Sequence, residues 1–247
     1  MKVSDLVQPK VFNADGQAAV LLICEHATNF IPVCFNGLGL SQQQLKSHIA
    51  WDPGAIELAQ AMAALLDAPL ISAPVSRLLY DCNRPLEAHS AIALTSEKQP
   101  IPGNLELSQV AIQVRVESYY RPFETAVGRQ VLAMDRTLII TIHSFTPAFL
   151  GQQRQVEIGV LHDEDRRFAD DFLQQGLTHA RFNMQRNQPY AATDGDGATH
   201  TLKQHALPLG LANLMLEIRN DLIASPQQQQ HMAAYLVKLI GLAQEKL

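Results

Sequence analysis

Polar side chains capable of acid–base or metal chemistry stand at the ends of several apolar segments of the sequence. They are Glu25-His26, Arg77 with the 81–84 segment, His143-Ser144, and the 217–221 segment. In open α/β sheets, ligands bind in the crevice beyond the carboxyl ends of the strands. If the apolar segments are parallel strands, we expect these separate groups to converge on one site.

Two histidines favour a metal site. A catalytic zinc ion typically takes three protein ligands drawn from His and Asp or Glu, and keeps a fourth position for water. His26 and His143 supply two such ligands. Either histidine alone can be an ordinary hydrogen-bonded residue at a strand end, but the two together with Glu217 favour the metal. Ser144 lacks the G-x-S-x-G turn of a serine nucleophile, so serine hydrolysis is not expected.

The elements that must position these groups are short apolar runs that alternate with stretches of helical period. This alternation is expected of an α/β domain with a largely parallel sheet. The predicted strands, each apolar enough to be buried on both faces, are 19–24, 69–73, 137–142, 156–162 and 212–218. The predicted helices are 55–67, 107–132 with a break at Pro122, 163–179 with Asp163 as N-cap, and 225–247 with Ser225 as N-cap.

Two segments without clear periodicity, 85–106 and 183–210, are rich in Pro, Gly, Asn, Thr and Asp. Structureless segments of that length inside a compact domain are usually functional. We predict that they form walls of the active site.

Composition and charge exclude several classes of protein. The 247 residues, 47% of them hydrophobic, are enough for one domain spanning 1–247. The formal net charge of -5 gives no reason to expect nucleic acid as a partner. No segment approaches the roughly 18 apolar residues that span a membrane. The first ten residues lack an apolar signal segment, and three cysteines do not suggest a disulfide framework, so a cytoplasmic location is expected.

Five segments together resemble the N-formylglutamate amidohydrolase family. They are CEHATNFIP (24–32), WDPGA (51–55), SRLLYDCNRP (76–85), IHSFTP (142–147) and EIRNDL (217–222). That family is similar in fold to the zinc exopeptidases, including carboxypeptidases and aspartoacylases, in which D-x-N-R, H-S and E-x-R-D-like segments recur in the same order. The resemblance implies a three-layer, phosphorylase/hydrolase-like α/β fold with a mostly parallel mixed sheet, and one zinc ion per chain.

The resemblance also implies roles for individual residues. His26 and His143 are expected as zinc ligands and Glu217 as the general base. Such a carboxylate takes a proton from zinc-activated water and passes it to the leaving amine. Asn83 and Arg84 are expected to bind the substrate carboxylate, with Arg84 forming a bidentate pair unless it belongs to a structural salt bridge. Ser144 is assigned to the same substrate site.

The third zinc ligand stays open. The exopeptidase pattern has Glu three residues after the first His, whereas this chain has Asn29, whose amide oxygen is a poor zinc ligand. Asp52 is the preferred candidate and Glu25 is another. The alternative role for Asp52 is an ordinary N-cap of the 55–67 helix.

Arg77 and Tyr190 complete the predicted site. Arg77 is expected to polarise the scissile carbonyl or stabilise the oxyanion, with a structural arginine as the alternative. Tyr190 lies in the 183–210 segment and is expected to close over the substrate, with an ordinary loop tyrosine as the alternative.

These patterns predict zinc-dependent hydrolysis of the amide bond of a small, carboxylate-bearing N-acyl amino acid such as N-formylglutamate. Two alternatives stay open. One is an N-acetylmuramoyl-type or peptide amidase of the same fold. The other is a non-catalytic binding protein, because fold does not determine function, and an incomplete zinc site would favour it.

Overall fold

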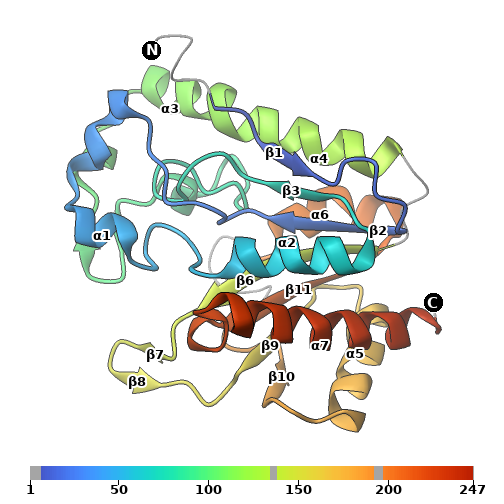
Figure 1. Ribbon diagram of the computed structural model, residues 1–247. Coiled ribbons are helices and arrows are strands. Elements are labelled where there is room, and N and C mark those ends of the chain that lie inside the picture. The colour runs from blue at the N-terminus through green and yellow to red at the C-terminus, as the bar shows by residue number, and fades with distance from the viewer. Residues whose placement is uncertain (1–6, 134–137, 192–196, 247) are drawn as a thin grey trace.

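A computed structural model describes residues 7–133, 138–191 and 197–246 of the chain. Its centre is a seven-stranded sheet (Figure 1). In spatial order the strands are β1 (Lys10–Phe12), β3 (Leu70–Ser72), β2 (Val20–Cys24), β6 (Leu138–Phe145), β11 (Ala212–Arg219), β9 (Ile158–Leu161) and β10 (Met184–Arg186). Strands β3, β2, β6 and β11 run parallel, whereas β1, β9 and β10 run in the opposite direction. The predicted mixed, mostly parallel sheet is therefore confirmed.

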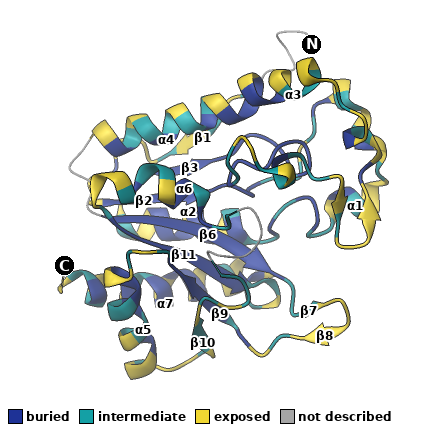
Figure 2. Cartoon of the chain, turned by 180° about the vertical axis from the view of Figure 1, so that it is seen from behind, coloured by how far each residue is buried: buried dark blue, intermediate teal, exposed yellow. Residues whose placement is uncertain are grey.

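Helices cover both faces of the sheet and produce three layers (Figures 1 and 2). One face packs against α2 (Ala55–Leu66), α5 (Arg167–Thr178) and α7 (Pro226–Gln244). The other packs against α4 (Arg121–Ala133) and α6 (His200–His205), and α3 (Gln109–Arg115) leads into α4. The short helix α1 (Gln42–Lys46) lies between β2 and α2 in the chain. Among the described residues, no helix is both long and apolar enough to traverse a membrane.

Two hairpins lie outside the main sheet. They are β4 (Thr95–Ser96) with β5 (Gln99–Pro100), and β7 (Ala148–Phe149) with β8 (Gln152–Gln153). Both follow segments that also supply the site described below.

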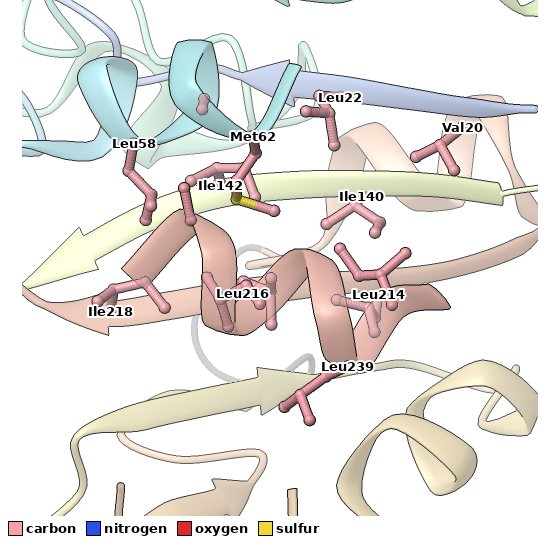
Figure 3. Packing of buried hydrophobic residues seen from close by; sticks show 14 of the residues in the cluster. Val20, Leu22, Leu58, Met62, Ile140, Ile142, Leu214, Leu216, Ile218 and Leu239 are labelled. Carbon is pink, nitrogen blue, oxygen red and sulfur yellow. The ribbon is translucent and has the colours of Figure 1, made fainter. Parts of the chain in front are cut away.

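The central strands are apolar along their length because both of their faces are covered. Alternate side chains of one strand face opposite helical layers. The set toward α2 and α7 includes Val20, Leu22, Ile140, Ile142, Leu214, Leu216 and Ile218, which pack with Leu58 and Met62 of α2 and Leu239 of α7 (Figure 3). The set toward α4 and α6 includes Leu21, Ile23, Ile71, Ile139 and Met215. Burying one such side chain contributes about 1.5–3 kcal/mol, so the strand ends are a firm support for the residues beyond them.

The helix predicted over 107–132 is not broken at Pro122. A π-helical turn, Val116–Tyr120, joins α3 to α4, and the Arg121 N–H donates to the Val116 carbonyl. Pro122 lies in the first turn of α4, a position that tolerates proline. The irregularity therefore comes one turn earlier than predicted, as a π turn inside a continuous helical segment.

The predicted N-cap Asp163 is wrong, because α5 begins later, at Arg167. Asp165 accepts a hydrogen bond from the backbone N–H of Arg167 at 3.0 Å. Asp163 instead forms an ion pair with Lys203, 2.7 Å away. The Asp165 carboxylate, two residues before Arg167, accepts from the first N–H of α5, so the Asp163 carboxylate can pair with Lys203 of α6.

The predicted N-cap of α7 is confirmed. Ser225 accepts from the N–H of Gln228, whose side chain in turn accepts from the Ser225 N–H. The sequence does not predict β1, β10, α1 or α6, since elements of three to six residues carry little periodicity. Thr137 and Leu247, the end residues of two predicted elements, lie outside the described residues.

Gly54 lets α2 begin directly against the segment before α7. Its φ is +82°, and a Cβ atom there would lie 2.6 Å from the Ile223 carbonyl oxygen. We expect Gly54→Ala to lower the free energy of unfolding by about 2–4 kcal/mol, from left-handed strain and overpacking together. Gly151→Ala is the matched control, because Gly151 has a φ of +84° but open space around it. Urea unfolding measures both losses, and equal losses would show that the contact with Ile223 has no effect.

Candidate active site

All the predicted site residues line one cavity of about 240 Å³ beyond the carboxyl ends of β2, β6 and β11. They are His26, Asp52, Arg77, Asn83, Arg84, His143, Ser144, Tyr190 and Glu217. The segments predicted as walls also contribute, through Ser96 and Glu97 on one side and Ala198 on the other. The structure thus brings together residues that are spread over most of the chain.

The strand alternation explains why three ionisable groups of the site are buried. His143 and Glu217 are paired in register on the neighbouring strands β6 and β11. Both continue the alternate set that faces α4 and α6, after Ile139 and Met215. Glu25, directly after β2, is in the same phase. Their exposures are only 1% for His143, 1% for Glu25 and 6% for Glu217, so each needs a charged or polar partner.

His26, His143 and Asp52 bring three potential ligand atoms together. The Oδ2 atom of Asp52 lies 3.2 Å from Nδ1 of His26 and 3.0 Å from Nδ1 of His143. The two Nδ1 atoms are 3.1 Å apart. The backbone N–H of Ser144 donates to the same Oδ2 at 3.2 Å, and the Ser144 hydroxyl donates to the Pro53 carbonyl at 2.8 Å. Ser144 therefore helps to fix Asp52.

A second carboxylate contacts the other nitrogen of each imidazole. Nε2 of His26 lies 2.8 Å from Oδ1 of Asp81, and Nε2 of His143 lies 3.2 Å from Oε2 of Glu25. The His26 contact is a hydrogen bond, and an Nε2–H that donates to Asp81 fixes the tautomer and leaves Nδ1 as a lone pair. The His143 contact with Glu25 is at ion-pair distance without hydrogen-bond geometry. Both Nδ1 atoms face Asp52.

Three acceptor atoms that face one another need a positive charge between them. Burial opposes ionisation of Asp52, but His26 and His143 together lower its pKa below the ordinary value. Burial likewise opposes protonation of His143, but Glu25 and Asp52 raise its pKa well above the ordinary value. Ligand atoms about 2.0–2.1 Å from a tetrahedral zinc ion are about 3.3 Å apart, close to the separations here. These residues therefore form a group able to hold a metal ion.

Asp52 is the residue that completes this group. The amide nitrogen of Asn29 donates to the Leu45 carbonyl at 2.8 Å. Glu25 contacts the far nitrogen of His143 rather than the shared centre. The N-cap of α2 is Gly54, and no side chain caps the helix. The alternative role of Asp52 as an ordinary N-cap is therefore wrong.

Arg77 lies beside the carboxylates of the site. Its Nη1 is 3.5 Å from Oδ1 of Asp52 and its Nη2 is 3.3 Å from Oδ2 of Asp81. Burial opposes ionisation of Asp81, but His26, Arg84 and Arg77 lower its pKa well below the ordinary value. Asp81 therefore stays ionised as the acceptor that orients His26.

Glu217 lies at the cavity with its Oε2 atom buried and without a hydrogen-bond partner in the described part of the chain. Burial raises its pKa to about 7, and Asp52 acts in the same direction, whereas His143, His26 and Arg77 oppose the shift. A carboxylate that titrates near neutral pH and has an unpaired oxygen is suited to acid–base chemistry.

Asn83 and Arg84 contact the segment before α6. The Asn83 amide donates to the Ala198 carbonyl at 2.6 Å and accepts from the Thr201 N–H at 3.1 Å. Nη1 of Arg84 donates to the carbonyls of Asn83 and Gly197, at 2.8 and 3.4 Å. Nε of Arg84 is buried and has no partner among the described residues. Arg84 thus has donors left for a ligand, whereas the Asn83 amide is used within the protein.

Sequence reasoning missed an aromatic part of the cavity. Phe145 and Phe149 line it together with Tyr190, and the guanidinium of Arg154 lies over all three rings. The only signal was the pair of phenylalanines four residues apart, at the end of β6 and in β7, which has no periodicity to interpret. Asp81 and Glu25 as partners of the histidines were also missed, because that pairing depends on tertiary structure.

Comparisons with known proteins show the family and the fold of the chain. The family model for N-formylglutamate amidohydrolase matches residues 18–224. A gene product of Agrobacterium tumefaciens is 44% identical, with 100% of this chain and 98% of that chain covered and a TM-score of 0.94. The N-formylglutamate amidohydrolase of Ralstonia eutropha shares the fold at 17% identity, with 98% and 100% covered and a TM-score of 0.73. No curated protein matches the sequence.

The fold, the cavity and the family match define a hydrolase that acts on amide bonds. The chain belongs to the N-formylglutamate amidohydrolase family. The resemblance and the enzyme class predicted from the sequence are therefore confirmed.

Asp52 and Glu25 are expected to respond differently to substitution. Asp52→Asn changes a ligand atom, whereas Glu25→Gln changes only the partner of His143 Nε2. We expect Glu25→Gln to weaken the binding of a divalent cation by about 10- to 100-fold, as an outer carboxylate does, and Asp52→Asn to weaken it more. Competition with a chelator measures both, and Glu57→Gln, exposed on α2, is the control. A larger loss for Glu25→Gln would make Glu25 the ligand.

The raised pKa of Glu217 has a consequence for the stability of the metal-free protein. Between an unfolded pKa of about 4.3 and a folded pKa of about 7, the folded state holds a proton that the unfolded state releases. Stability therefore falls as pH rises through this window. We compare the free energy of unfolding of Glu217→Gln with that of the unsubstituted chain. Between about pH 5 and about pH 8, we expect this difference to change by on the order of 1–3 kcal/mol in favour of the variant. Chemical unfolding at both pH values tests this, and a difference independent of pH would contradict the raised pKa.

Proposed function

We propose that this chain hydrolyses the amide bond of a small N-acyl amino acid of the N-formylglutamate kind, using one zinc ion held by His26, Asp52 and His143. The observation that carries the proposal is the convergence of two Nδ1 atoms and Oδ2 of Asp52, 3.0 to 3.2 Å apart, in the cavity that Glu217 also lines. Membership of the family supports the type of bond that is cleaved.

The ligand set supports zinc. Two imidazoles and one carboxylate are a common catalytic set, which leaves a position open toward the cavity. Zinc in such a site brings the pKa of a water molecule toward neutrality and withdraws charge from a carbonyl oxygen. Asp81 and Glu25 contribute by holding each imidazole in the tautomer that presents Nδ1.

Glu217 is the proposed general base. Its pKa of about 7 lets it accept a proton at neutral pH, and its Oε2 atom has no competing partner among the described residues. It takes a proton from the attacking water as the new C–O bond forms. It then gives the proton to the nitrogen as the C–N bond breaks, so the leaving group departs as an amine.

The remaining cavity residues are proposed to bind the substrate. Arg84 offers Nε and Nη2 to a carboxylate as a planar pair of donors. Arg77 is placed to polarise the scissile carbonyl, with Tyr190 closing the cavity and Asn83 and Ser144 supporting the walls. A cavity of about 240 Å³ favours a small metabolite over a muropeptide or a peptide chain.

Two broader expectations belong to the same proposal. We place the protein in the cytoplasm, where the buried thiols of Cys24 and Cys82 stay reduced. We also take residues 1–247 as one domain, because its two main hydrophobic clusters lie on opposite faces of one sheet.

Glu217→Gln separates base catalysis from a structural role. The variant keeps the shape of the side chain but removes the proton acceptor, so we expect turnover to fall by about 10²- to 10⁴-fold. Zinc content, measured by elemental analysis, should stay near one per chain. Normal turnover in the zinc-loaded variant would refute the role of Glu217. Lost stability with normal activity per folded molecule would indicate a structural role.

Arg84→Lys tests recognition of the substrate carboxylate. A lysine keeps the charge but loses the planar pair of donors. We expect KM for a carboxylate-bearing substrate to rise about 10- to 100-fold, with bound zinc unchanged. Arg129→Lys, on the exposed side of α4, is the control. An unchanged KM would remove Arg84 from the substrate site.

A further inference from the structure

Three aromatic side chains form a distinct part of the catalytic cavity, the aromatic wall. Phe145 ends β6, Phe149 lies in β7, and Tyr190 follows β10. Phe145 is 2% exposed and Phe149 is 37% exposed, so the wall runs from the buried interior to the surface. Phe149 forms its exposed edge.

Arg154 fixes this wall from behind. Its guanidinium carbon lies 5.4 Å from the ring centre of Phe145, 4.8 Å from that of Phe149 and 4.9 Å from that of Tyr190. Its Nη2 also donates to the Tyr190 hydroxyl at 3.1 Å. Arg154 is not among the residues that line the cavity. It is therefore a positioning residue that joins three separate segments through cation–π contacts and one hydrogen bond.

The topology separates the aromatic wall from Arg84. Arg84 follows β3, whereas the wall comes from β6, from the hairpin after it, and from the segment after β10. In the sheet, β3 and β10 lie on opposite sides of the β6–β11 pair that carries His143 and Glu217. A substrate bound at this centre therefore has the guanidinium on one side and aromatic rings on the other.

The charges that line the cavity suit one carboxylate on the substrate. They comprise the guanidiniums of Arg77 and Arg84 and the carboxylates of Asp52, Glu97 and Glu217. Arg77 is already paired with two carboxylates. A bound divalent cation brings this set from one negative to one positive charge. A net charge of one positive complements a substrate with a single carboxylate. A second carboxylate on the substrate would lie against the aromatic rings.

His48 is counted as neutral in this balance. It lines the cavity, and its Nε2 lies 2.8 Å from Oε1 of Glu97. Within the described lining, Arg84 remains the cationic side chain whose donors are not committed to a carboxylate.

We propose that the aromatic wall, held by Arg154, receives an apolar group of the substrate, so that the preferred substrate is an N-acyl amino acid with one carboxylate and an apolar side chain. This inference rests on the proposed function and narrows its substrate class. A γ-carboxylate placed against the rings of Phe145 and Phe149 loses hydration there without gaining a hydrogen-bond donor, whereas a leucine or phenylalanine side chain gains contact.

Kinetics of the zinc-loaded enzyme with matched substrates test the preference. N-formyl-L-leucine, N-formyl-L-phenylalanine and N-formyl-L-glutamate differ only in the side chain. We expect kcat/KM for the two apolar substrates to exceed that for N-formyl-L-glutamate by at least about 10-fold. The Glu217→Gln variant should bind the substrates without turnover. Titration calorimetry with this variant is expected to rank the affinities of the three substrates in the same order as kcat/KM.

Substitutions in the hairpin test whether the wall causes the preference. Phe149→Arg adds a cation to the wall and should shift the ratio of kcat/KM toward N-formyl-L-glutamate by about 10-fold or more. Leu150→Arg adds the same charge at the next residue, which is 56% exposed and does not line the cavity, and should leave the ratio unchanged. Arg154→Lys should raise KM for N-formyl-L-leucine more than it changes kcat, at unchanged zinc content.

The outcomes separate this inference from the proposed function. Turnover of all three substrates with N-formyl-L-glutamate preferred would overturn the inference and leave the amidohydrolase proposal intact. An equal shift for Phe149→Arg and Leu150→Arg would also overturn it. No turnover of any of the three by the zinc-loaded enzyme would refute the proposed function, and the inference with it.

Discussion

The imidazoles of His26 and His143 are each held by a buried carboxylate at Nε2, and this constraint determines the rest of the site. Because Asp81 and Glu25 occupy the outer nitrogens at 2.8 and 3.2 Å, both Nδ1 atoms turn toward Asp52. Rotation of either imidazole to relieve the resulting crowding would take its Nε2 away from a buried carboxylate. A cation or a proton between these atoms therefore stabilises the centre.

The same need for positive charge explains the electrostatics of the neighbouring groups. Without a cation, the cluster holds a proton on His143, whose pKa is raised well above the ordinary value by Glu25 and Asp52 despite burial. Glu217, in register with His143 on the next strand, is raised mainly by burial to about 7. A strand surface that would otherwise be apolar thus carries ionisable groups at a cost in stability. Such a cost is common where a site is organised for catalysis.

Much of this arrangement could be predicted from the sequence. The buried central strands appear as continuous apolar runs, and the ends of those runs place His26, His143 and Glu217 at one edge of a parallel sheet. Ser225 caps α7 as its local pattern predicts. These features depend on local sequence or on a general rule of topology.

Other features could not be predicted, because they depend on contacts between distant segments. Glu25 follows β2, Asp81 follows β3 and Asp52 precedes α2. Only the positions of these carboxylates in space separate the inner one from the two outer ones. Asp163 and Asp165 offer similar caps, but Asp163 forms an ion pair with Lys203 of the distant helix α6, and Asp165 accepts from the N–H of Arg167. Arg154 stands in a polar segment, and nothing in the sequence indicates that three aromatic rings surround it.

Identifying the atoms that bind the metal is the most direct test of the arrangement described for this site. We expect a crystal structure of the zinc-loaded protein, with the metal located by anomalous scattering, to place zinc about 2.0–2.2 Å from Nδ1 of His26, Nδ1 of His143 and a carboxylate oxygen of Asp52. Asp81 and Glu25 should remain on the two Nε2 atoms. Zinc bound through Nε2 of either histidine, or bound by Glu25 in place of Asp52, would contradict the arrangement described for this site.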